Sequence, residues 1–166
     1  YNITYCRGCY KCVYENHGLP IGICPLKDDM AGILKEYLEA DGYIMACPVY
    51  DFTVTAVMKA FIERRFPMFY KTKGDIGIPD ARVKQNFKKK ALLIATGSAR
   101  DEFAEMAEPC FEVMSGHFMV EEVEVIKRLY VGFIHNFDEQ RYAEKMQQTF
   151  ALGVRLVEEI AKAQAT

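Results

Sequence analysis

Hydrophobic residues in this chain occur both as short continuous runs and as regularly spaced stripes. Residues 43–47 and 91–95 are continuous apolar runs, followed by the turn-forming residues Pro48 and Gly97. Such runs are typical of strands buried on both faces of a parallel sheet. We therefore predict two buried strands at these positions. Residues 118–133 predict one or two further extended segments, with apolar and acidic residues alternating around Val120, Val123 and Val125.

Four segments carry apolar residues at helical spacing. The first begins at Asp28, whose carboxylate can cap a helix, and the second covers residues 56–65. A third helix is predicted from Asp101 to about Ser115, and a fourth begins at Asp138, with both aspartates as caps. The apolar stripe predicted for the last helix comprises Tyr142, Met146, Phe150, Val154, Val157 and Ile160.

The alternation of strands and helices defines the predicted fold class. It indicates an α/β domain in which helices cover both faces of a parallel sheet, a three-layer sandwich. The 166 residues fit one domain, residues 1–166, that is large enough for a hydrophobic core. Residues 67–86 break the pattern and predict a long irregular segment, a kind of loop that is often functional.

Composition narrows the class of protein. The net charge of −2 offers no electrostatic basis for binding nucleic acid. No apolar run approaches the ~20 residues that a membrane-spanning helix needs. No signal peptide is recognisable, so we expect a cytoplasmic protein without membrane contact, and the thiols of such a protein stay reduced.

The densest chemistry lies in a cysteine-rich loop, residues 6–27. Cys6, Cys9 and Cys12 follow one another at three-residue intervals, and Cys24 comes after a longer gap. Four thiolates so placed can wrap an iron–sulfur cluster or a structural zinc ion, or the loop can hold no metal at all. Two further cysteines, Cys47 and Cys110, lie within predicted elements and are interpreted as small core residues.

Two loops are predicted to form a ligand site. In open α/β sheets, ligands bind beyond the carboxyl ends of the strands, where residues 48–53 and 96–101 lie here. These loops combine small or hydroxyl residues with the aromatics Tyr50 and Phe52, which suits a flat, partly polar cofactor such as a flavin. The sequence contains no recognisable Ser/His/Asp arrangement or phosphate-binding P-loop, so a cofactor rather than a dedicated acid–base pair is expected to carry the chemistry.

The order of several motifs resembles a known family. The cysteines, Asp28-Asp29-Met30, Ala40-Asp41-Gly42, Pro48-Val49-Tyr50 and the segment 58–64 (MKAFIER) together resemble the NADPH-dependent FMN reductase family, in particular its iron–sulfur flavoprotein branch. The resemblance implies a flavodoxin-like sheet, bound FMN and reduction by NAD(P)H. It also implies a homodimer or tetramer.

The same resemblance implies roles for particular residues. One loop would line the flavin ring, and a second would form the other side of the ring site. In the iron–sulfur branch the four cysteines would hold a [4Fe-4S] cluster. The first loop comprises Pro48, Val49, Tyr50, Asp51, Phe52 and Thr53, the second comprises Thr96, Gly97 and Ser98, and the cluster ligands would be Cys6, Cys9, Cys12 and Cys24.

The chain departs from the family pattern in two ways. The family begins with a strand and a phosphate-binding loop, which this sequence lacks, so we expect roughly 40 more N-terminal residues in the natural protein, about one βαβ unit. The gap between Cys12 and Cys24 is also longer than the compact spacing of the iron–sulfur branch.

The sequence therefore predicts an FMN-dependent oxidoreductase. Electrons from NAD(P)H, or from ferredoxin if a cluster is present, would pass through the flavin to a flavin, quinone or other small acceptor. Two alternatives stay open. One is a flavodoxin-type electron carrier without NAD(P)H turnover, and the other is a metal-binding sensor that uses the cysteine loop and binds no flavin.

Overall fold

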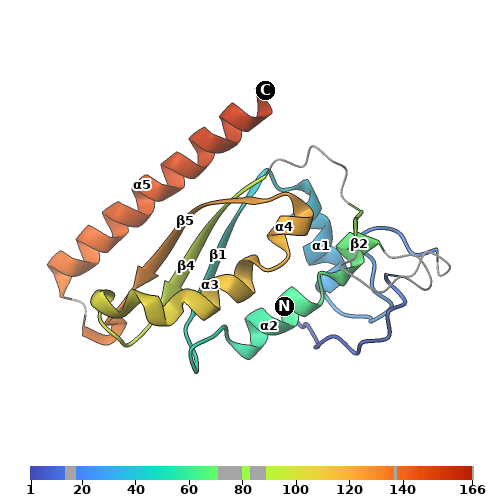
Figure 1. Cartoon of the computed structure of the whole chain (residues 1–166), viewed down its shortest axis with the longest axis horizontal. Coiled ribbons are helices and arrows are strands. Elements are labelled where there is room, and N and C mark those ends of the chain that lie inside the picture. The colour runs from blue at the N-terminus through green and yellow to red at the C-terminus, as the bar shows by residue number, and fades with distance from the viewer. Residues whose placement is uncertain (14–17, 71–79, 83–88, 137, 166) are drawn as a thin grey trace. The chain divides into compact units, whose positions relative to one another are not determined.

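The computed structural model describes residues 1–13, 18–70, 80–82, 89–136 and 138–165 (Figure 1). The chain forms two compact units, each built from two separate stretches of sequence. One unit combines Tyr1–Ala40 with Ala56–Phe87, and the other combines Asp41–Thr55 with Lys88–Thr166. The first is called the cysteine unit and the second the sheet unit.

The sheet unit is built on three parallel strands. β1 (Gly42–Pro48), β4 (Lys90–Thr96) and β5 (Glu124–Val131) lie in the order β1-β4-β5. This confirms the predicted strands at residues 43–47 and 91–95 and the parallel α/β class. The register sets Pro48 opposite Thr96 and Thr96 opposite Val131, so the carboxyl ends of all three strands lie level.

Helices cover both faces of this sheet. The long helix α5 (Glu139–Gln164) runs along one face, and α3 (Glu108–Ser115) and α4 (Phe118–Glu121) lie on the other (Figure 1). Neighbouring residues of β1 show the division, because successive side chains point to opposite faces. Ile160 of α5 lies against Gly42, whereas the ring of Tyr43 stacks on Phe118 with their centroids 6.2 Å apart.

The structure corrects two predicted elements. The helix predicted from Asp101 to Ser115 is a 3₁₀ segment, η3 (Asp101–Ala107), kinked at Phe103 and followed by α3. Asp101 does not cap it. The extended segment predicted from residue 118 begins instead with α4, and a left-handed Glu122 (φ 55°) turns the chain into the single strand β5. The spacing of apolar residues in these two segments is compatible with more than one local structure, so it did not reveal the short helical turns.

The helix α5 begins as predicted but faces the sheet with a different side. Asp138 caps it, since its Oδ1 accepts a hydrogen bond from the Arg141 amide at 2.7 Å. Only Leu156 is fully buried among the described α5 residues. Most of the predicted stripe is exposed, namely Tyr142, Met146, Phe150, Val154 and Val157. The sheet-facing side lies about 100° away, one residue earlier along the helix.

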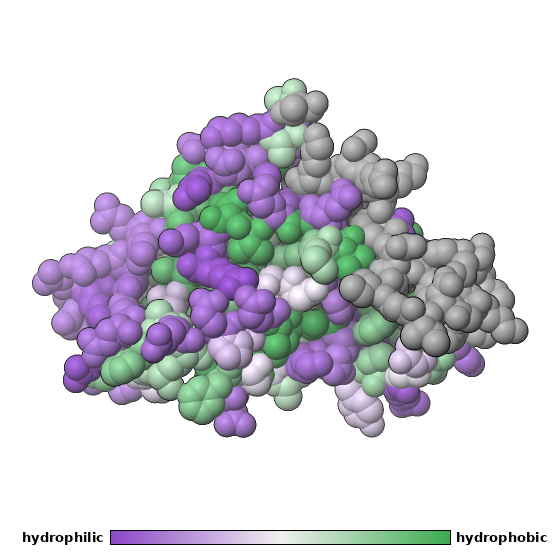
Figure 2. All heavy atoms as spheres, viewed as in Figure 1, coloured by the Kyte–Doolittle hydropathy of each residue, from purple (hydrophilic) through white to green (hydrophobic). Residues whose placement is uncertain are grey.

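β1 also departs from the prediction, because only one of its faces is buried. Tyr43, Met45 and Cys47 are buried, whereas Ile44 is 56% exposed. β1 is an edge strand of the described sheet. The face of β1 that carries Ile44 is the face that α5 contacts at Gly42. Hydrophobic side chains also reach the surface among hydrophilic ones on the face drawn in Figure 2.

The cysteine unit contains short elements and two buried arginine side chains, Arg64 and Arg65. α1 (Met30–Glu39) and α2 (Ala56–Glu63) are its helices, and η2 (Phe66–Met68) leads into an antiparallel pair, β2 (Phe69–Tyr70) with β3 (Asp80–Ala81). η2, β2 and β3 fall largely within residues 67–86, the segment predicted to be irregular. Residues 71–79 and 83–86 of that segment are outside the described residues. Within the described residues, no helix is both long and apolar enough to span a bilayer.

Leu156 and Phe150 test which side of α5 is packed. Leu156→Ala should lower the free energy of unfolding by about 2–5 kcal/mol, because it leaves a cavity in the core. Phe150→Ala, at a position 74% exposed, should change it by less than about 0.5 kcal/mol. Urea denaturation of both variants measures this. A large loss for Phe150→Ala would mean that another segment or subunit covers the stripe.

Candidate functional site

The first candidate site is where the two predicted flavin loops meet in the sheet unit. The amide of Val49 donates a hydrogen bond of 2.7 Å to the carbonyl oxygen of Thr96. The parallel register that pairs Pro48 with Thr96 places both loops at the same edge of the sheet. The structure therefore brings residues 48–53 and 96–98 together.

The first loop is a tight and strained turn. The amide of Tyr50 donates to the carbonyl of Thr53 at 2.9 Å, and the Thr53 amide donates back to the Tyr50 carbonyl at 3.0 Å. Between them Asp51 and Phe52 have positive φ angles of 49° and 60°. A left-handed conformation is uncommon outside glycine and costs of order 1–2 kcal/mol per residue. Strain of this kind clusters at functional sites.

The turn presents two aromatic rings at the surface. Tyr50 is 64% exposed and Phe52 is 58% exposed. Neither ring contributes to the buried core, so core packing does not explain their presence at this strand end. Flat exposed rings beside a polar loop offer stacking surfaces to a planar ligand.

The second loop is held against the end of β5 by two glycines. A Cβ on Gly97 would lie 2.5 Å from the Tyr130 hydroxyl oxygen, and one on Gly132 would lie 2.3 Å from the carbonyl oxygen of Ala99. Tyr130 donates a 3.0 Å hydrogen bond to that same carbonyl. Because real Cβ atoms do not approach backbone atoms so closely, position 132 requires glycine, whereas a side chain at position 97 would have to displace the Tyr130 side chain. Residues 96–99 are therefore fixed by direct backbone contact.

Asp101 anchors the far side of this loop, a role that the sequence did not reveal. Its carboxylate accepts hydrogen bonds from the Gly132 amide at 2.8 Å and from Arg141 at 3.2 Å, and it pairs with Lys145 at 2.7 Å. Burial acts to raise the pKa of Asp101, but the hydrogen bonds and these two cations outweigh it and lower the pKa. The only signal was the four-residue spacing of Arg141 and Lys145, which places them on one helix face.

The second candidate site is a cavity in the cysteine unit. It has a volume of about 350 Å³, and all four predicted metal ligands line it, namely Cys6, Cys9, Cys12 and Cys24. All four are free thiols. Burial, reinforced by the neighbouring Cys24, raises the pKa of Cys12 to about 12. Without a positively charged centre the Cys12 thiol is therefore protonated at neutral pH, and metal binding would release its proton.

The donor set can be compared with the needs of a single metal ion and of a cluster. Within the described part of the chain, no three His, Cys, Asp or Glu side chains are close enough together to hold one metal ion. A tetrahedral zinc site requires its ligands around one atom. In a four-iron cluster each cysteine binds a different iron, so the sulfurs lie further apart around a larger volume. Four thiols around one cavity fit that second arrangement.

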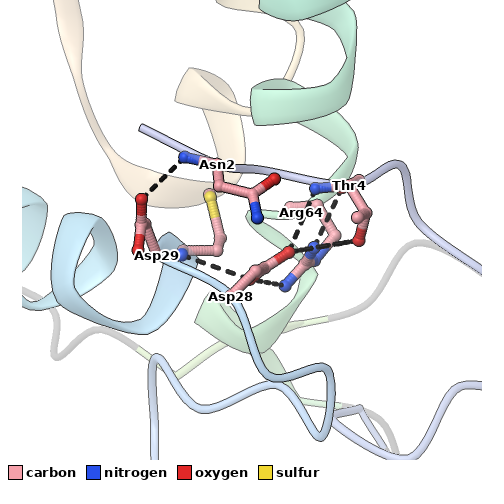
Figure 3. Close-up of polar contacts among 6 residues, drawn as sticks. Asn2, Thr4, Asp28, Asp29 and Arg64 are labelled. Carbon is pink, nitrogen blue, oxygen red and sulfur yellow. Dashed lines mark hydrogen bonds and ion pairs between the residues drawn. The ribbon is translucent and has the colours of Figure 1, made fainter.

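A buried ion pair fixes both ends of the cysteine loop (Figure 3). Arg64, just after α2, binds Asp28 through two nitrogens, at 2.6 Å and 2.8 Å, and Arg64 also donates to the Thr4 carbonyl oxygen at 2.9 Å. The Asp28 carboxylate in turn accepts from the amide and hydroxyl of Thr4, both at 3.1 Å. The side chains of Arg64 and Asp28 are only 1% and 3% exposed.

The remaining two cysteines belong to the core, as predicted. Cys47 and Cys110 are buried, and Cys47 Sγ accepts a hydrogen bond from the Thr55 amide at 3.3 Å. Burial raises the pKa of Cys110 to about 12. A protonated, buried thiol is a poor nucleophile and a poor redox group.

Comparison with known proteins identifies the family. The NADPH-dependent FMN reductase family model matches residues 5–127. Since this is well over half of the chain, the protein belongs to that family. An iron–sulfur flavoprotein of Archaeoglobus fulgidus is 42% identical over 65 residues, which are 39% of this chain and 27% of that protein.

Two further similarities complete this comparison. An iron–sulfur flavoprotein of Methanocaldococcus jannaschii is 41% identical over 63 residues, 38% of this chain and 30% of that protein. The chain thus aligns with less than a third of the length of either flavoprotein. A structure from Klebsiella pneumoniae, provisionally assigned as a quinone reductase, superposes with a TM-score of 0.54 at 21% identity, over 72% of this chain and 51% of that one. This likeness supports the flavodoxin-like fold expected from the sequence.

Gly132 tests how the second loop is held. Gly132→Ala should lower the free energy of unfolding by about 1–3 kcal/mol, because the loop backbone must move away from the new methyl group. Gly153→Ala, in α5 with open space around its Cβ, is the matched control and should raise it by about 0.5–1 kcal/mol. Equal effects of the two changes in urea denaturation would show that the close approach at Gly132 is not a constraint.

The ion pair predicts a pH dependence. Hydrogen bonding from Arg64, against the opposing effect of burial, lowers the pKa of Asp28 well below its usual range. A lowered folded-state pKa contributes stability above the unfolded value of about 3.9 that is lost as the pH falls. Unfolding free energy should therefore decrease below about pH 5. Asp28→Asn should cost about 3–5 kcal/mol at pH 7 and flatten the acid limb, whereas Glu39→Gln, at a 67% exposed carboxylate, should leave the profile unchanged.

Proposed function

We propose that this protein is an FMN-dependent oxidoreductase that takes electrons from NAD(P)H and passes them to a small acceptor such as a flavin or quinone. The observation that carries the proposal is the meeting of residues 48–53 and 96–98 at the carboxyl ends of adjacent parallel strands. Ligands bind at this edge in open α/β sheets. The chain's membership of the NADPH-dependent FMN reductase family supports a flavin as that ligand.

The residues of the two loops have separate tasks in this proposal. Tyr50 and Phe52 would supply the stacking surface for the flavin ring, and the strained turn between Tyr50 and Thr53 would aim those rings. Thr96 and Ser98 would offer hydroxyl groups to the polar edge of the ring, on a backbone that Gly97 and Gly132 keep in place. A bound flavin supplies the two-electron chemistry itself, and the protein contributes position and electrostatics.

We further propose that Cys6, Cys9, Cys12 and Cys24 hold a [4Fe-4S] cluster. The cavity that all four cysteines line supports this assignment. The two proteins from Archaeoglobus and Methanocaldococcus, which are similar to this chain over short segments, are named iron–sulfur flavoproteins. A cluster would exchange single electrons, and it would allow ferredoxin to serve as a donor in place of NAD(P)H.

Spectroscopy of the anaerobically purified full-length protein tests both cofactors. We expect flavin absorption bands with FMN released on denaturation, and iron with acid-labile sulfide at about four atoms each per chain. Anaerobic NADPH should bleach the flavin bands. Flavin that stays oxidised would indicate an electron carrier, and a colourless protein after reconstitution with FMN, iron and sulfide would contradict the proposal.

Tyr50 tests the assigned flavin loop. Tyr50→Ala should weaken FMN binding at least tenfold, about 1.4 kcal/mol, because one stacking surface is lost. Tyr142→Ala is the matched control, since Tyr142 is similarly exposed at 56% but lies on α5. Fluorescence titration of the apoprotein with FMN gives both dissociation constants. Unchanged affinity in Tyr50→Ala would remove residues 48–53 from the flavin site.

A further inference from the structure

Arg64 lines the cysteine cavity, and one of its buried nitrogens has no hydrogen-bond partner among the described residues. Its two terminal nitrogens are occupied by Asp28 and Thr4. The nitrogen without a partner among the described residues is Nε, whose N–H is buried. Leaving a buried donor unsatisfied is costly, and more so for a charged group. A guanidinium that is fully buried and incompletely bonded therefore indicates a partner in the cavity that it lines.

The chemistry of the cavity identifies that partner as anionic sulfur. Arg64 lines the same cavity as Cys24 and the other three cysteines, so thiolate sulfur is the acceptor that this cavity offers to its guanidinium. Hydrogen bonds to thiolate or sulfide are a principal means by which proteins set the potential of an iron–sulfur cluster.

We propose that Arg64 is a positioning residue of the cysteine cavity, which donates its Nε–H to anionic sulfur at Cys24 and favours the reduced state of the bound cluster. The proposal rests on the cluster assigned above. When the cluster takes up one electron, its negative charge rises by one unit, and a fixed buried cation stabilises the more negative state. Arg64 can do this without moving, because its two terminal nitrogens are hydrogen-bonded to Asp28 and Thr4.

A second cation on the same cavity serves as a control. Lys59 also lines the cavity, but its side chain is 51% exposed and pairs with Glu63 at 2.7 Å. Solvent screening makes such a charge weak. Lys59→Met and Arg64→Gln remove the same formal charge from the same cavity. If Arg64→Gln changes the cluster potential more, the difference comes from burial and hydrogen bonding and not from charge alone.

The experiment measures the midpoint potential of the cluster in the full-length protein by anaerobic titration with dithionite. Circular dichroism first checks the fold of each variant, and iron and sulfide analysis checks its cluster content. Arg64→Gln should lower the potential by at least about 59 mV, a tenfold change in the one-electron equilibrium. Arg64→Lys should recover part of the shift, and Lys59→Met should move it by less than a third as much.

Asp28→Asn separates positioning from mere structural support. It removes the negative partner of the ion pair but leaves the Arg64 cation, which still donates to the Thr4 carbonyl oxygen, with one negative charge fewer beside it, so the potential should stay the same or rise. If Arg64 acts only by holding the loop, both variants should lower it together. That result, or equal shifts for Arg64→Gln and Lys59→Met, would overturn the proposal. If Arg64→Gln does not fold, the signs for Arg64→Lys and Asp28→Asn decide.

Wild-type protein distinguishes failure of this inference from failure of the proposed function. A wild-type chain that binds no iron after reconstitution would overturn the cluster assignment and the role of Arg64 with it. A wild-type chain with a full cluster, whose potential is insensitive to Arg64, would overturn the role of Arg64 alone.

Discussion

The cysteine unit depends on the buried ion pair between Arg64 and Asp28. This pair joins three stretches of chain, namely the segment before Cys6, the start of α1 and the end of α2. A buried pair of this kind is costly to break, since removal of one partner leaves the other charge unsolvated. It therefore closes the cysteine loop at both ends. The four thiols can line one cavity because the backbone that carries them begins and ends at the same guanidinium.

In the sheet unit the corresponding constraint is the parallel register of β1, β4 and β5. Level strand ends bring the loops after β1 and β4 into hydrogen-bonding contact through Val49 and Thr96. The loop after β4 is then held against the end of β5, where Gly132 leaves no room for a side chain. Rigid strand ends thus support a strained, aromatic turn at Tyr50 to Thr53, where local propensity alone would not keep Asp51 and Phe52 left-handed.

Much of the fold was predictable from the sequence, and the sequence also named the loops and cysteines that the structure brings together. The apolar runs at residues 43–47 and 91–95 form strands as predicted, although only the central strand β4 has a strand on each side. Asp138 was recognisable as a cap from its position before an amphipathic stretch. The errors lie where several outcomes satisfy the same local pattern: the kink at Phe103, the helical turn of α4 and the side of α5 that faces the sheet.

The sequence by itself determined the residue types, namely which loops carry hydroxyls and aromatics, which segment carries four cysteines, and which strands run in parallel. Only the tertiary structure decided which groups meet. Asp101 was predicted to cap a helix but binds Gly132, Arg141 and Lys145 instead. Arg64, at the end of α2, pairs with Asp28 and lines the cavity of the four cysteines. Spacing along the chain describes neighbours within one helix or strand, whereas burial and charge pairing are settled between segments far apart in sequence. For that reason the cysteine motif could be recognised in the sequence, whereas the position of Arg64 beside it could not.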